Sequence, residues 1–269
     1  MIINVTLTRH FAAALSHWER AGPKGRVRVA SEVHMVSIQN QVAVVTGAGR
    51  GIGRAIAVEL GKLGARVALA ARRRTELEET GRIIGSSASV IPTDVRRKEE
   101  LQRLFEQVST AIGPVDILVN AAGLGIFGPV VNFKDEDFAT LIETNLRGMF
   151  FACRFVLPSM IERKTGHIIN IASIAGKVGS ANRAVYCASK FGVVGFTESL
   201  AEEIRQHGIR ATVICPGSTD TSFSPESKEN KARERMLRPA DVAHAVRMIV
   251  TQEPNSFISE IVMRPTKKP

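Results

Sequence analysis

The chain has 269 residues, 44% hydrophobic and 23% charged, an ordinary composition for a globular protein that suits one large α/β domain. No apolar run approaches the roughly 18 residues that a membrane-spanning helix needs, so we expect no membrane partner. The net charge of +10 comes from basic residues that form no single stripe and accompany no aromatic–basic motif, which argues against nucleic acid as a partner.

Residues 1–37 differ from the rest of the chain. The segment is rich in basic residues and contains only two acids, Glu19 and Glu32. No regular helix or strand period continues through it. Three interpretations fit: a targeting peptide, an ordered arm, or an upstream stretch read from an early start codon, with Met35 as the natural start. We favour the last, and treat residues 38–269 as a single folded domain.

From residue 41 onward, short apolar runs alternate with longer segments of helical period. This alternation indicates βαβ units and a parallel sheet, and continuous apolar runs are typical of strands buried on both faces. With right-handed crossovers, the order predicts a Rossmann-type, doubly wound, mostly parallel seven-stranded sheet with helices on both faces. The predicted strands are Val42–Val45, Val67–Ala70, Ser89–Ile91, Ile117–Val119, Ile168–Ile171, Ala211–Ile214 and, less regular than the others, Phe257–Val262.

A glycine-rich turn joins the first predicted strand to the helical pattern Arg54–Leu63. Glycines in such a turn let the backbone approach a pyrophosphate, and the N-terminus of the following helix offers free N–H donors. The sequence therefore predicts a dinucleotide cofactor bound by Gly47, Gly49, Arg50, Gly51, Ile52 and Gly53.

The end of the second predicted strand indicates which nicotinamide cofactor binds. A site for NAD usually places an acid there, bonded to the ribose 2′-hydroxyl, but this chain has no acid before Glu76 and reads Ala71-Arg72-Arg73-Arg74. Arg72 and Arg50 can bind a 2′-phosphate, and one well-placed arginine gives a preference of roughly 10- to 100-fold. We therefore expect NADP(H), and assign Arg73 and Arg74 to the start of an exposed helix.

Tyr186 is the only tyrosine of the chain, and it lies four residues before Lys190 in the helical pattern Ala184–His207. This spacing puts both side chains on one helix face. A free phenol has a pKa near ~10, and lowering it by about three units requires roughly 4 kcal/mol of preference for the phenolate. A lysine ammonium and an oxidised nicotinamide ring can supply this preference, so the pair is a candidate for proton exchange with a carbonyl or alcohol oxygen.

Further motifs occur in a fixed order along the chain. They are Asp94-Val95 after the third predicted strand, Asn120-Ala121-Ala122-Gly123 after the fourth, Asn145 in the segment 143–146, Ser173 after the fifth, and Pro216-Gly217 after the sixth. With the glycine turn and the Tyr186–Lys190 pair, they form a highly specific set. From about Ser37 to Thr266 the chain resembles the short-chain dehydrogenase/reductase family, including its 3-oxoacyl-carrier-protein reductase-like members.

The resemblance implies four catalytic residues. Tyr186 would give a proton to the substrate oxygen, which Ser173 would orient, and Lys190 would hold the nicotinamide ribose and lower the tyrosine pKa. Asn145 would interrupt its helix and hold a water that resupplies the proton. The resemblance also implies cofactor contacts from the residues after the third to sixth strands: Asp94 and Val95 at the adenine, the wall of Asn120, Ala121, Ala122 and Gly123 (which also ties strands together), and Pro216, Gly217 and Thr219.

In this family, substrate choice depends on the lid segment, here residues 218–237, which is rich in charges. It could present a basic rim to an acidic carrier protein or an anionic substrate. We favour a solvated helix with pairs such as Glu229–Arg233, and expect Phe223 and Met236 to be apolar lid contacts.

The C-terminal stretch 259–265 lacks the glycine pair that ends many 3-oxoacyl-carrier-protein reductases. Its absence argues against assigning the chain to that subgroup and against the tetramer usual there. Phe150, Phe151 and Phe155 favour pairing of two copies, so we expect a homodimer or homotetramer. The three cysteines and six histidines are scattered, which predicts no disulfide framework, no metal site and a cytoplasmic location.

The sequence thus predicts an NADP(H)-dependent oxidoreductase acting on the CH–OH group of a small-molecule carbonyl or alcohol. A 3-oxoacyl thioester is one candidate substrate, beside hydroxy acids, sugars and hydrophobic ketones. The contrasting hypothesis is a non-catalytic NADP(H)-binding regulatory protein, against which the intact set of four catalytic residues argues.

Overall fold

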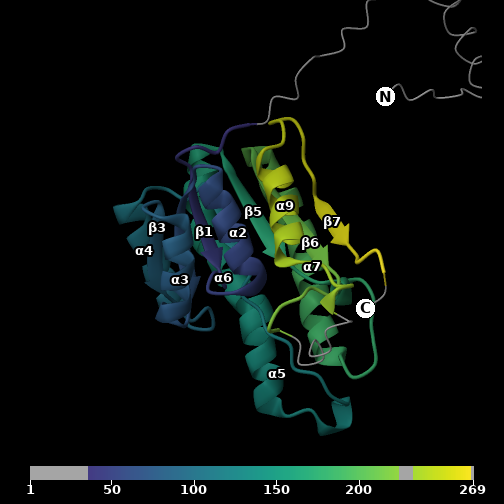
Figure 1. Cartoon of the computed structure of the whole chain (residues 1–269). Helices are drawn as coiled ribbons and strands as arrows, with labels where there is room; N and C mark the ends of the chain where they lie inside the picture. Colours follow the sequence, from purple (N-terminus) through teal and green to yellow (C-terminus); the bar gives the residue numbers. More distant parts are fainter. Residues whose placement is uncertain (1–35, 224–232, 268–269) are drawn as a thin grey trace, which may run out of the picture. The chain divides into compact units, whose positions relative to one another are not determined.

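The computed structural model describes residues 36–223 and 233–267, which belong to one compact unit, Met35–Pro269. Seven strands form one sheet in the order β3-β2-β1-β4-β5-β6-β7, and every neighbouring pair is parallel (Figure 1). The strand order reverses between β1 and β4, which makes the sheet doubly wound as predicted. The strands are β1(Val42–Thr46), β2(Arg66–Ala71), β3(Ala88–Pro92), β4(Ile117–Asn120), β5(Gly166–Ile171), β6(Ile209–Pro216) and β7(Glu260–Met263).

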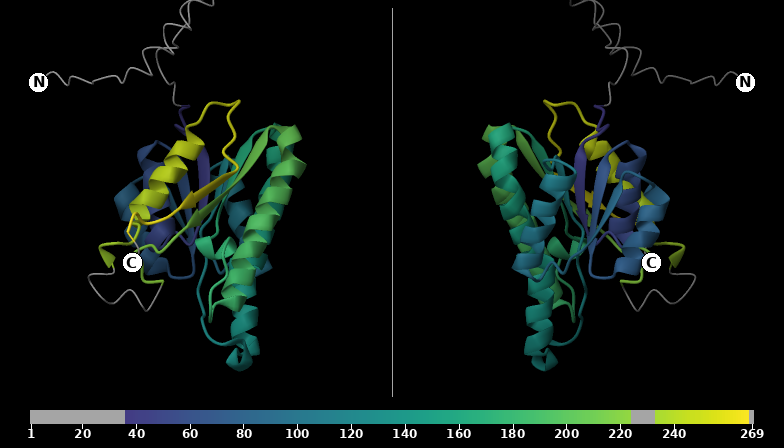
Figure 2. Two further views of the ribbon diagram at one scale, coloured as in Figure 1. Left: turned by 90° about the vertical axis from the view of Figure 1, so that its right-hand side faces the viewer. Right: turned by 90° about the vertical axis from the view of Figure 1, so that its left-hand side faces the viewer.

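Helices cover both faces of the sheet (Figure 2). One face carries α2(Gly51–Lys62), α3(Arg74–Ile84) and α9(Pro239–Val250), and the other carries α4(Lys98–Ala111), α6(Gly148–Arg163) and α7(Ala184–Ile204). The helix α5(Asp135–Ile142) is joined to α6 by the π-helical turn η2(Glu143–Arg147) and extends beyond the end of the domain at which β7 ends (Figure 1). Residues 36–223 and 233–267 also form three short 3-10 turns, η1(Val130–Asn132), η3(Ile174–Gly176) and η4(Arg205–His207).

The central strand β1 shows why apolar runs become this sheet. All five of its residues are buried, and successive side chains point to opposite faces. Val42 and Val44 pack into the cluster under α4, α6 and α7, whereas Ala43 and Val45 pack into the cluster under α2 and α9. Because both faces are covered, the strand needs no polar side chain on either, which is the pattern that the sequence displays.

The structure corrects two of the predicted boundaries. The last strand is Glu260–Met263, not Phe257–Val262, and Phe257 is an exposed residue before it. The helix after the glycine turn begins at Gly51, three residues before the predicted start, and Ile52 in its first turn packs against the cluster under α2 and α9. The extension predicted for residues 1–37 lies outside the described residues, apart from Val36 and Ser37.

Two further properties concern the described part of the chain. No helix within it combines the length and apolarity needed to cross a bilayer. Cys153, Cys187 and Cys215 are all buried free thiols, so none of them forms a disulfide.

Candidate active site

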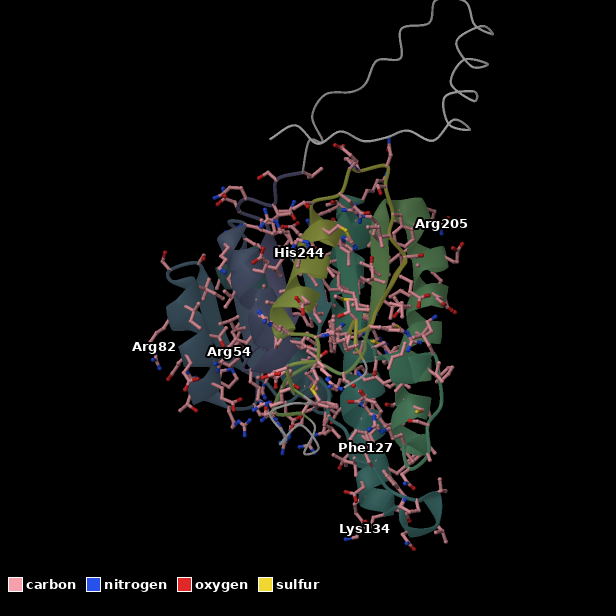
Figure 3. The ribbon with its side chains drawn as sticks, turned by 45° about the vertical axis from the view of Figure 1, so that its right-hand side comes forward. Arg54, Arg82, Phe127, Lys134, Arg205 and His244 are labelled. Atoms are coloured by element: carbon pink, nitrogen blue, oxygen red, sulfur yellow. The ribbon has the colours of Figure 1, made fainter. Side chains whose placement is uncertain are left out.

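A cavity of about 1180 Å³ opens at the carboxyl ends of the strands, around the point where the strand order reverses. Phe127, labelled in Figure 3, lies in its wall, on the loop between β4 and α5. The cavity brings together most of the predicted site residues: Gly47, Gly49, Arg50, Gly51, Ile52, Gly53, Arg72, Asp94, Val95, Ala121, Ala122, Gly123, Ser173, Tyr186, Lys190, Pro216, Gly217 and Thr219.

The backbone of the glycine turn is packed so closely that a Cβ atom has no room at Gly47 or Gly53. Gly47 has a φ of +70°, and a Cβ there would lie 2.8 Å from the carbonyl oxygen of Ala121. A Cβ on Gly53 would lie 2.3 Å from the carbonyl oxygen of Gly47. The turn therefore folds back against the start of α2, and this helix N-terminus borders the cavity as a site for an anion.

Cations surround the cavity at the carboxyl end of β2. Arg50 and Arg72 are exposed residues that line it, as predicted. Arg73 is the N-cap residue of α3, exposed and paired with Glu76 at 2.5 Å, as expected for the start of an exposed helix, and it also lines the cavity. Arg74 does pair along the helix, with Glu78 at 3.8 Å.

Beyond β3, Asp94 forms an ion pair that the sequence analysis missed. Arg96 donates from Nη2 to Oδ2 of Asp94 at 2.6 Å and from Nε to Oδ1 at 3.1 Å. The hydrogen bond from Arg96 holds the pKa of the Asp94 carboxyl below its usual range. Asp94 therefore lines the predicted adenine end of the cavity as a carboxylate already fixed by a guanidinium.

Asn120 is the one predicted cofactor contact that does not line the cavity. Its Nδ2 donates to Oδ1 of Asn170 at 2.9 Å, and Nδ2 of Asn170 donates to Oγ1 of Thr197 at 2.9 Å. In β4, Leu118 packs under α4, α6 and α7, and alternation along the strand turns the side chain of Asn120 to the same face. Of the two predicted roles, Asn120 has the structural one: it ties β4 to β5 and, through Thr197, to α7.

Tyr186 and Lys190 lie in the first turns of α7 and are both buried. Lys190 donates from Nζ to the carbonyl oxygen of Ile171 at 3.0 Å, and this Nζ lies 6.0 Å from the centroid of the Tyr186 ring. Ser173 follows β5, accepts a hydrogen bond from the amide of Ala175 at 3.1 Å, and contacts Tyr186 through a side-chain hydrogen bond. Three of the four predicted catalytic side chains thus meet in one place.

Burial is the largest influence on the pKa values of Tyr186 and Lys190. It raises the pKa of Tyr186, against the lowering effects of the hydrogen bond with Ser173 and of the charge of Arg183. It also lowers the pKa of Lys190 to about 8. In the protein alone, therefore, Tyr186 is a protonated acid, and the charge of Arg183 is one of the effects that lower its pKa.

The depressed lysine pKa predicts a pH dependence of stability in the absence of nucleotide. Between about pH 8 and the usual lysine value of 10.5, the unfolded chain binds a proton at Lys190 that the folded chain has released. Stability contributed by this group therefore rises with pH, by at most about 1.4 kcal/mol per pH unit.

We expect the free energy of unfolding of the natural chain, relative to Lys190→Met, to increase across this window in denaturant titrations. The comparison cancels the buried thiol Cys153, whose raised pKa acts in the opposite direction in both proteins. A difference that stays flat from pH 7.5 to 10 would contradict the prediction.

Asn145 lies in the π-helical turn, so it interrupts the helix between α5 and α6 as predicted. It is buried behind the cavity: its Oδ1 accepts from the amide of Leu124 at 2.9 Å, and its Nδ2 donates to Oγ of Ser189 at 3.1 Å. A Cβ on Gly123 would lie 3.3 Å from this Oδ1 and 3.5 Å from Nζ of Lys190. The absence of a side chain at Gly123 thus lets Asn145 and Lys190 approach the same point.

The end of the cavity beside Tyr186 is largely aromatic. The Phe127 ring meets the Tyr186 ring edge-on, with the two centroids 5.4 Å apart. The Phe223 ring, in the lid segment, has its centroid 6.0 Å from that of Tyr186. Phe223 and Met236 line the cavity, as predicted for lid contacts. Sequence reasoning missed Phe127 and Arg183, although Arg183 stands only three residues before Tyr186.

The two ends of the lid are fixed to each other. The amide of Leu237 donates to the carbonyl of Ser218 at 2.9 Å, and the amide of Asp220 donates to the carbonyl of Leu237 at 2.8 Å. Arg233 pairs with Asp220 at 2.7 Å. The predicted partner of Arg233, Glu229, lies outside the described residues.

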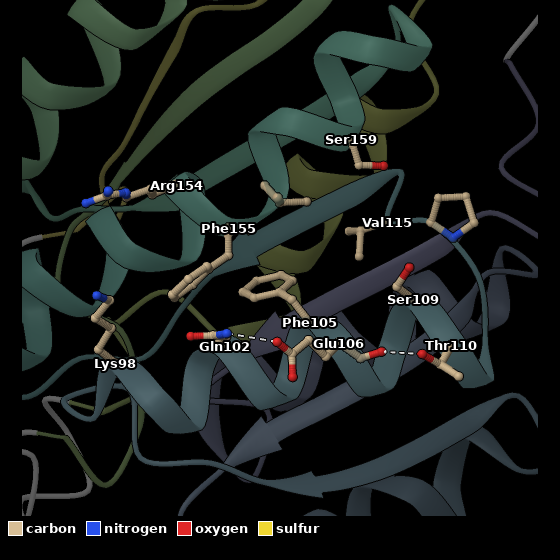
Figure 4. Close-up of a pocket in the computed structure, with 12 residues that line it drawn as sticks. Lys98, Gln102, Phe105, Glu106, Ser109, Thr110, Val115, Arg154, Phe155 and Ser159 are labelled. Carbon is tan, nitrogen blue, oxygen red and sulfur yellow. Dashed lines mark hydrogen bonds between the residues drawn. The ribbon is translucent and has the colours of Figure 1, made fainter.

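A second cavity, of about 540 Å³, lies between α4 and α6 (Figure 4). Two hydrogen bonds run along α4 in its wall: Gln102 donates to the Glu106 carboxylate at 2.9 Å, and Thr110 donates to the Glu106 carbonyl at 2.9 Å. Across the described part of the chain, no three His, Cys, Asp or Glu side chains are grouped to hold a metal ion. We therefore place the candidate active site in the larger cavity.

Comparison with known proteins identifies the family. The family model described as short chain dehydrogenase matches residues 41–232. An uncharacterized oxidoreductase of Staphylococcus aureus (strain MRSA252) is 35% identical over 232 residues, covering 86% of this chain and the relative's whole length. A metagenomic short-chain oxidoreductase solved in complex with NADP is 42% identical with a TM-score of 0.77, covering 86% of this chain and all of that one. A serine dehydrogenase in closed form, complexed with NADP+, is 33% identical with a TM-score of 0.78, covering 83% of this chain and 94% of that one. The chain therefore belongs to the short-chain dehydrogenase family.

Proposed function

We propose that this protein is an NADP(H)-dependent oxidoreductase that interconverts a carbonyl and an alcohol. The observation that carries the proposal is the meeting of Ser173, Tyr186 and Lys190 in the cavity that the glycine turn also lines. The two similar solved structures, complexed with NADP and NADP+, support the choice of cofactor.

The residues of the cavity fit such a cofactor. The glycine turn offers a backbone surface that a Cβ would block, at the N-terminus of α2, where a pyrophosphate is favoured. Arg50 and Arg72 would bind the 2′-phosphate, and Ala121, Ala122 and Gly123 would form the wall along the nucleotide. When bound, NADPH supplies the hydride for reduction of a carbonyl carbon.

The protein side chains would handle the proton and the orientation. Tyr186 stays protonated because burial raises its pKa, so it can donate its phenolic proton to the substrate oxygen. Ser173 would hold that oxygen by a second hydrogen bond. Lys190, fixed by Ile171, would hold the nicotinamide ribose, and Asn145 would position the loop at Leu124 and a water beside Lys190.

The test is oxidation of NADPH and NADH, measured side by side with an acetoacetyl thioester and with simple ketones and aldehydes. Turnover of the thioester with NADPH would support reduction of an acyl chain. Turnover of free ketones or aldehydes alone would indicate that the substrate is a small carbonyl compound. No turnover of any carbonyl with either cofactor would contradict the proposed function. Faster turnover with NADH would contradict the assignment of Arg50 and Arg72.

Arg72→Gln is expected to reduce the preference for NADPH over NADH. Loss of one charged hydrogen bond to the 2′-phosphate should lower the ratio of the two kcat/KM values roughly 10- to 100-fold. Arg74→Gln is the matched control, because Arg74 is an exposed arginine two positions away that pairs with Glu78 and does not line the cavity. Equal ratios in the two variants would contradict the role of Arg72.

We also infer that two copies pair through α6 and α7. Phe150 is 39% exposed and Phe191 is 46% exposed, on neighbouring helices of one sheet face. The Phe150 ring contacts those of Phe151 and Phe196 at 5.2 and 6.2 Å between centroids. Burial of this aromatic face supports a homodimer or homotetramer, which sedimentation or light scattering would measure.

A further inference from the structure

Two phenylalanine rings from distant parts of the sequence flank the ring of Tyr186. Phe127, labelled in Figure 3, belongs to the loop after β4, whereas Phe223 belongs to the lid segment. Their rings are inclined to that of Tyr186 by 87° and 55°, with centroid distances that are favourable for aromatic pairs. All three residues line the larger cavity, so Phe127 and Phe223 form an aromatic corner around Tyr186.

Gly125 allows the two phenylalanine rings of this corner to come together. A Cβ on Gly125 would lie 2.7 Å from Cζ of Phe127 and 2.9 Å from Cε1 of Phe223, so the edges of both rings rest on one glycine. A side chain at position 125 would displace at least one ring, whereas the backbone would not have to move, because both contacts are to the far ends of side chains. The aromatic corner is therefore continuous only while residue 125 is a glycine.

Further apolar side chains line the same cavity. Ile174 and Val178 line it on the segment after Ser173, and Met236 lines it near the end of the lid. Val178 is 57% exposed and Phe223 is 37% exposed, although both are large and apolar. Apolar side chains that stay exposed around a cavity are typical of a binding site for an apolar ligand.

The two cations nearest the aromatic corner have contacts within the chain. Lys190 donates from Nζ to the carbonyl oxygen of Ile171 at 3.0 Å. The guanidinium carbon of Arg183 lies 4.8 Å from the centroid of the Phe127 ring, within the range of a cation–π contact. An uncharged substrate leaves both contacts in place. The corner therefore matches a substrate by apolar shape, with the substrate oxygen as the group that receives hydrogen bonds.

We propose that Phe127 and Phe223 bind a flat, uncharged ring attached to the carbonyl group that Tyr186 protonates, and that Gly125 is the positioning residue for this specificity. Aromatic rings pack edge-on or offset with an attraction beyond that of their apolar area alone. Hydroxyl or carboxylate groups of sugars and hydroxy acids would lose hydrogen bonds to water against such a wall. This inference rests on the proposed function, which it narrows from carbonyl compounds in general to aryl ketones and aldehydes.

The experiment compares acetophenone with cyclohexyl methyl ketone, which has a saturated ring, and with butanone, which has no ring. Each ketone is titrated calorimetrically into the protein saturated with NADP+, where no hydride is available and the Kd reports binding alone. The Kd of acetophenone should be roughly 2- to 10-fold below that of cyclohexyl methyl ketone. Turnover with NADPH gives the aryl-to-alkyl ratio, which is kcat/KM for acetophenone divided by kcat/KM for butanone.

Gly125→Ala should lower the aryl-to-alkyl ratio roughly 3- to 10-fold, mainly through the KM of acetophenone, because the proton donor itself is not moved. Phe223→Leu should lower the ratio similarly, since it keeps an apolar side chain and removes the ring at a partly exposed position. Gly128→Ala is the matched control. Gly128 lies in the same loop, and a Cβ there would meet no atom within 4 Å, so both the Kd values and the ratio should stay those of the natural chain.

Three outcomes would overturn the inference: an acetophenone Kd that is no lower than that of cyclohexyl methyl ketone, an aryl-to-alkyl ratio that Gly125→Ala and Phe223→Leu leave unchanged, or equal changes in Gly125→Ala and Gly128→Ala. Turnover of butanone without turnover of acetophenone would also overturn it and leave the proposed function standing. Failure of every carbonyl with either cofactor would instead overturn the proposed function, while the calorimetric comparison still decides whether the aromatic corner binds a flat ring.

Discussion

Tyr186→Phe is expected to lower kcat by roughly 10²- to 10⁴-fold, because it removes the proton donor and leaves the ring in place. The phenol is buried between Phe127 and Phe223, so the same volume is filled in the variant and water has little room to replace the hydroxyl. NADPH binding, measured by the change in nucleotide fluorescence, should stay within a few-fold. Stopped-flow oxidation of NADPH with a good carbonyl substrate measures the loss.

The result separates chemistry from binding. If Tyr186 only shapes the cavity, the variant keeps its kcat and changes its KM. If Tyr186 is the acid, kcat falls and the free energy of unfolding changes only by the contribution of one hydrogen bond, about 0.5–1.5 kcal/mol. Turnover at the natural rate by Tyr186→Phe, the only tyrosine of the chain having been removed, would rule out a phenolic acid.

Gly53→Ala is expected to remove most NADPH binding and to destabilise the fold. Its Cβ would lie 2.3 Å from the backbone oxygen of Gly47, and neither atom belongs to a flexible side chain. The turn must therefore shift, which we expect to lower the free energy of unfolding by about 1–3 kcal/mol and the affinity for NADPH by at least roughly 10-fold. Denaturant titration and nucleotide fluorescence measure the two effects.

Gly81→Ala provides the matched control. Gly81 is also a helix residue, but a Cβ there would contact Cγ2 of Val90 at 3.5 Å, an ordinary van der Waals distance. Alanine should raise the free energy of unfolding by about 0.5–1 kcal/mol and leave NADPH binding unchanged. If Gly53→Ala behaved like Gly81→Ala, the close approach inferred for the phosphate turn would be wrong.

The sheet could be predicted because its strands are buried on both faces. Runs such as Val42–Val45 are continuous and apolar, and the turns after them carry the glycine and polar residues of the site. The alternation of side chains along β4 also predicts the direction of Asn120. It points to the same face of the sheet as Leu118, and so away from the cavity. The predicted cofactor contact at Asn120 came from position in a motif, not from side-chain direction.

The substrate end of the cavity could not be predicted in the same way. Phe127 stands in an irregular loop with no period, and its contact with Tyr186 depends on how that loop folds over α7. In the sequence, Arg183 is an ordinary residue at the start of a helix. Its position over the Phe127 ring depends on how two distant segments fold together, which no local pattern predicts. The protonated state of Tyr186 likewise depends on burial, which the spacing of Tyr186 and Lys190 does not encode.

The paired ends of the lid have an evolutionary consequence. Because Leu237 is bonded to Ser218 and Asp220, the chain between them is an insertion that starts and finishes at one place on the domain. Doubling the length of a loop closed in this way costs only about 0.6 kcal/mol. Meanwhile α7, with Tyr186 and Lys190, is held to the sheet by the separate ladder from Asn120 to Thr197. Relatives of this protein could therefore differ in the segment 218–237 while keeping the proposed acid and the cofactor cavity unchanged.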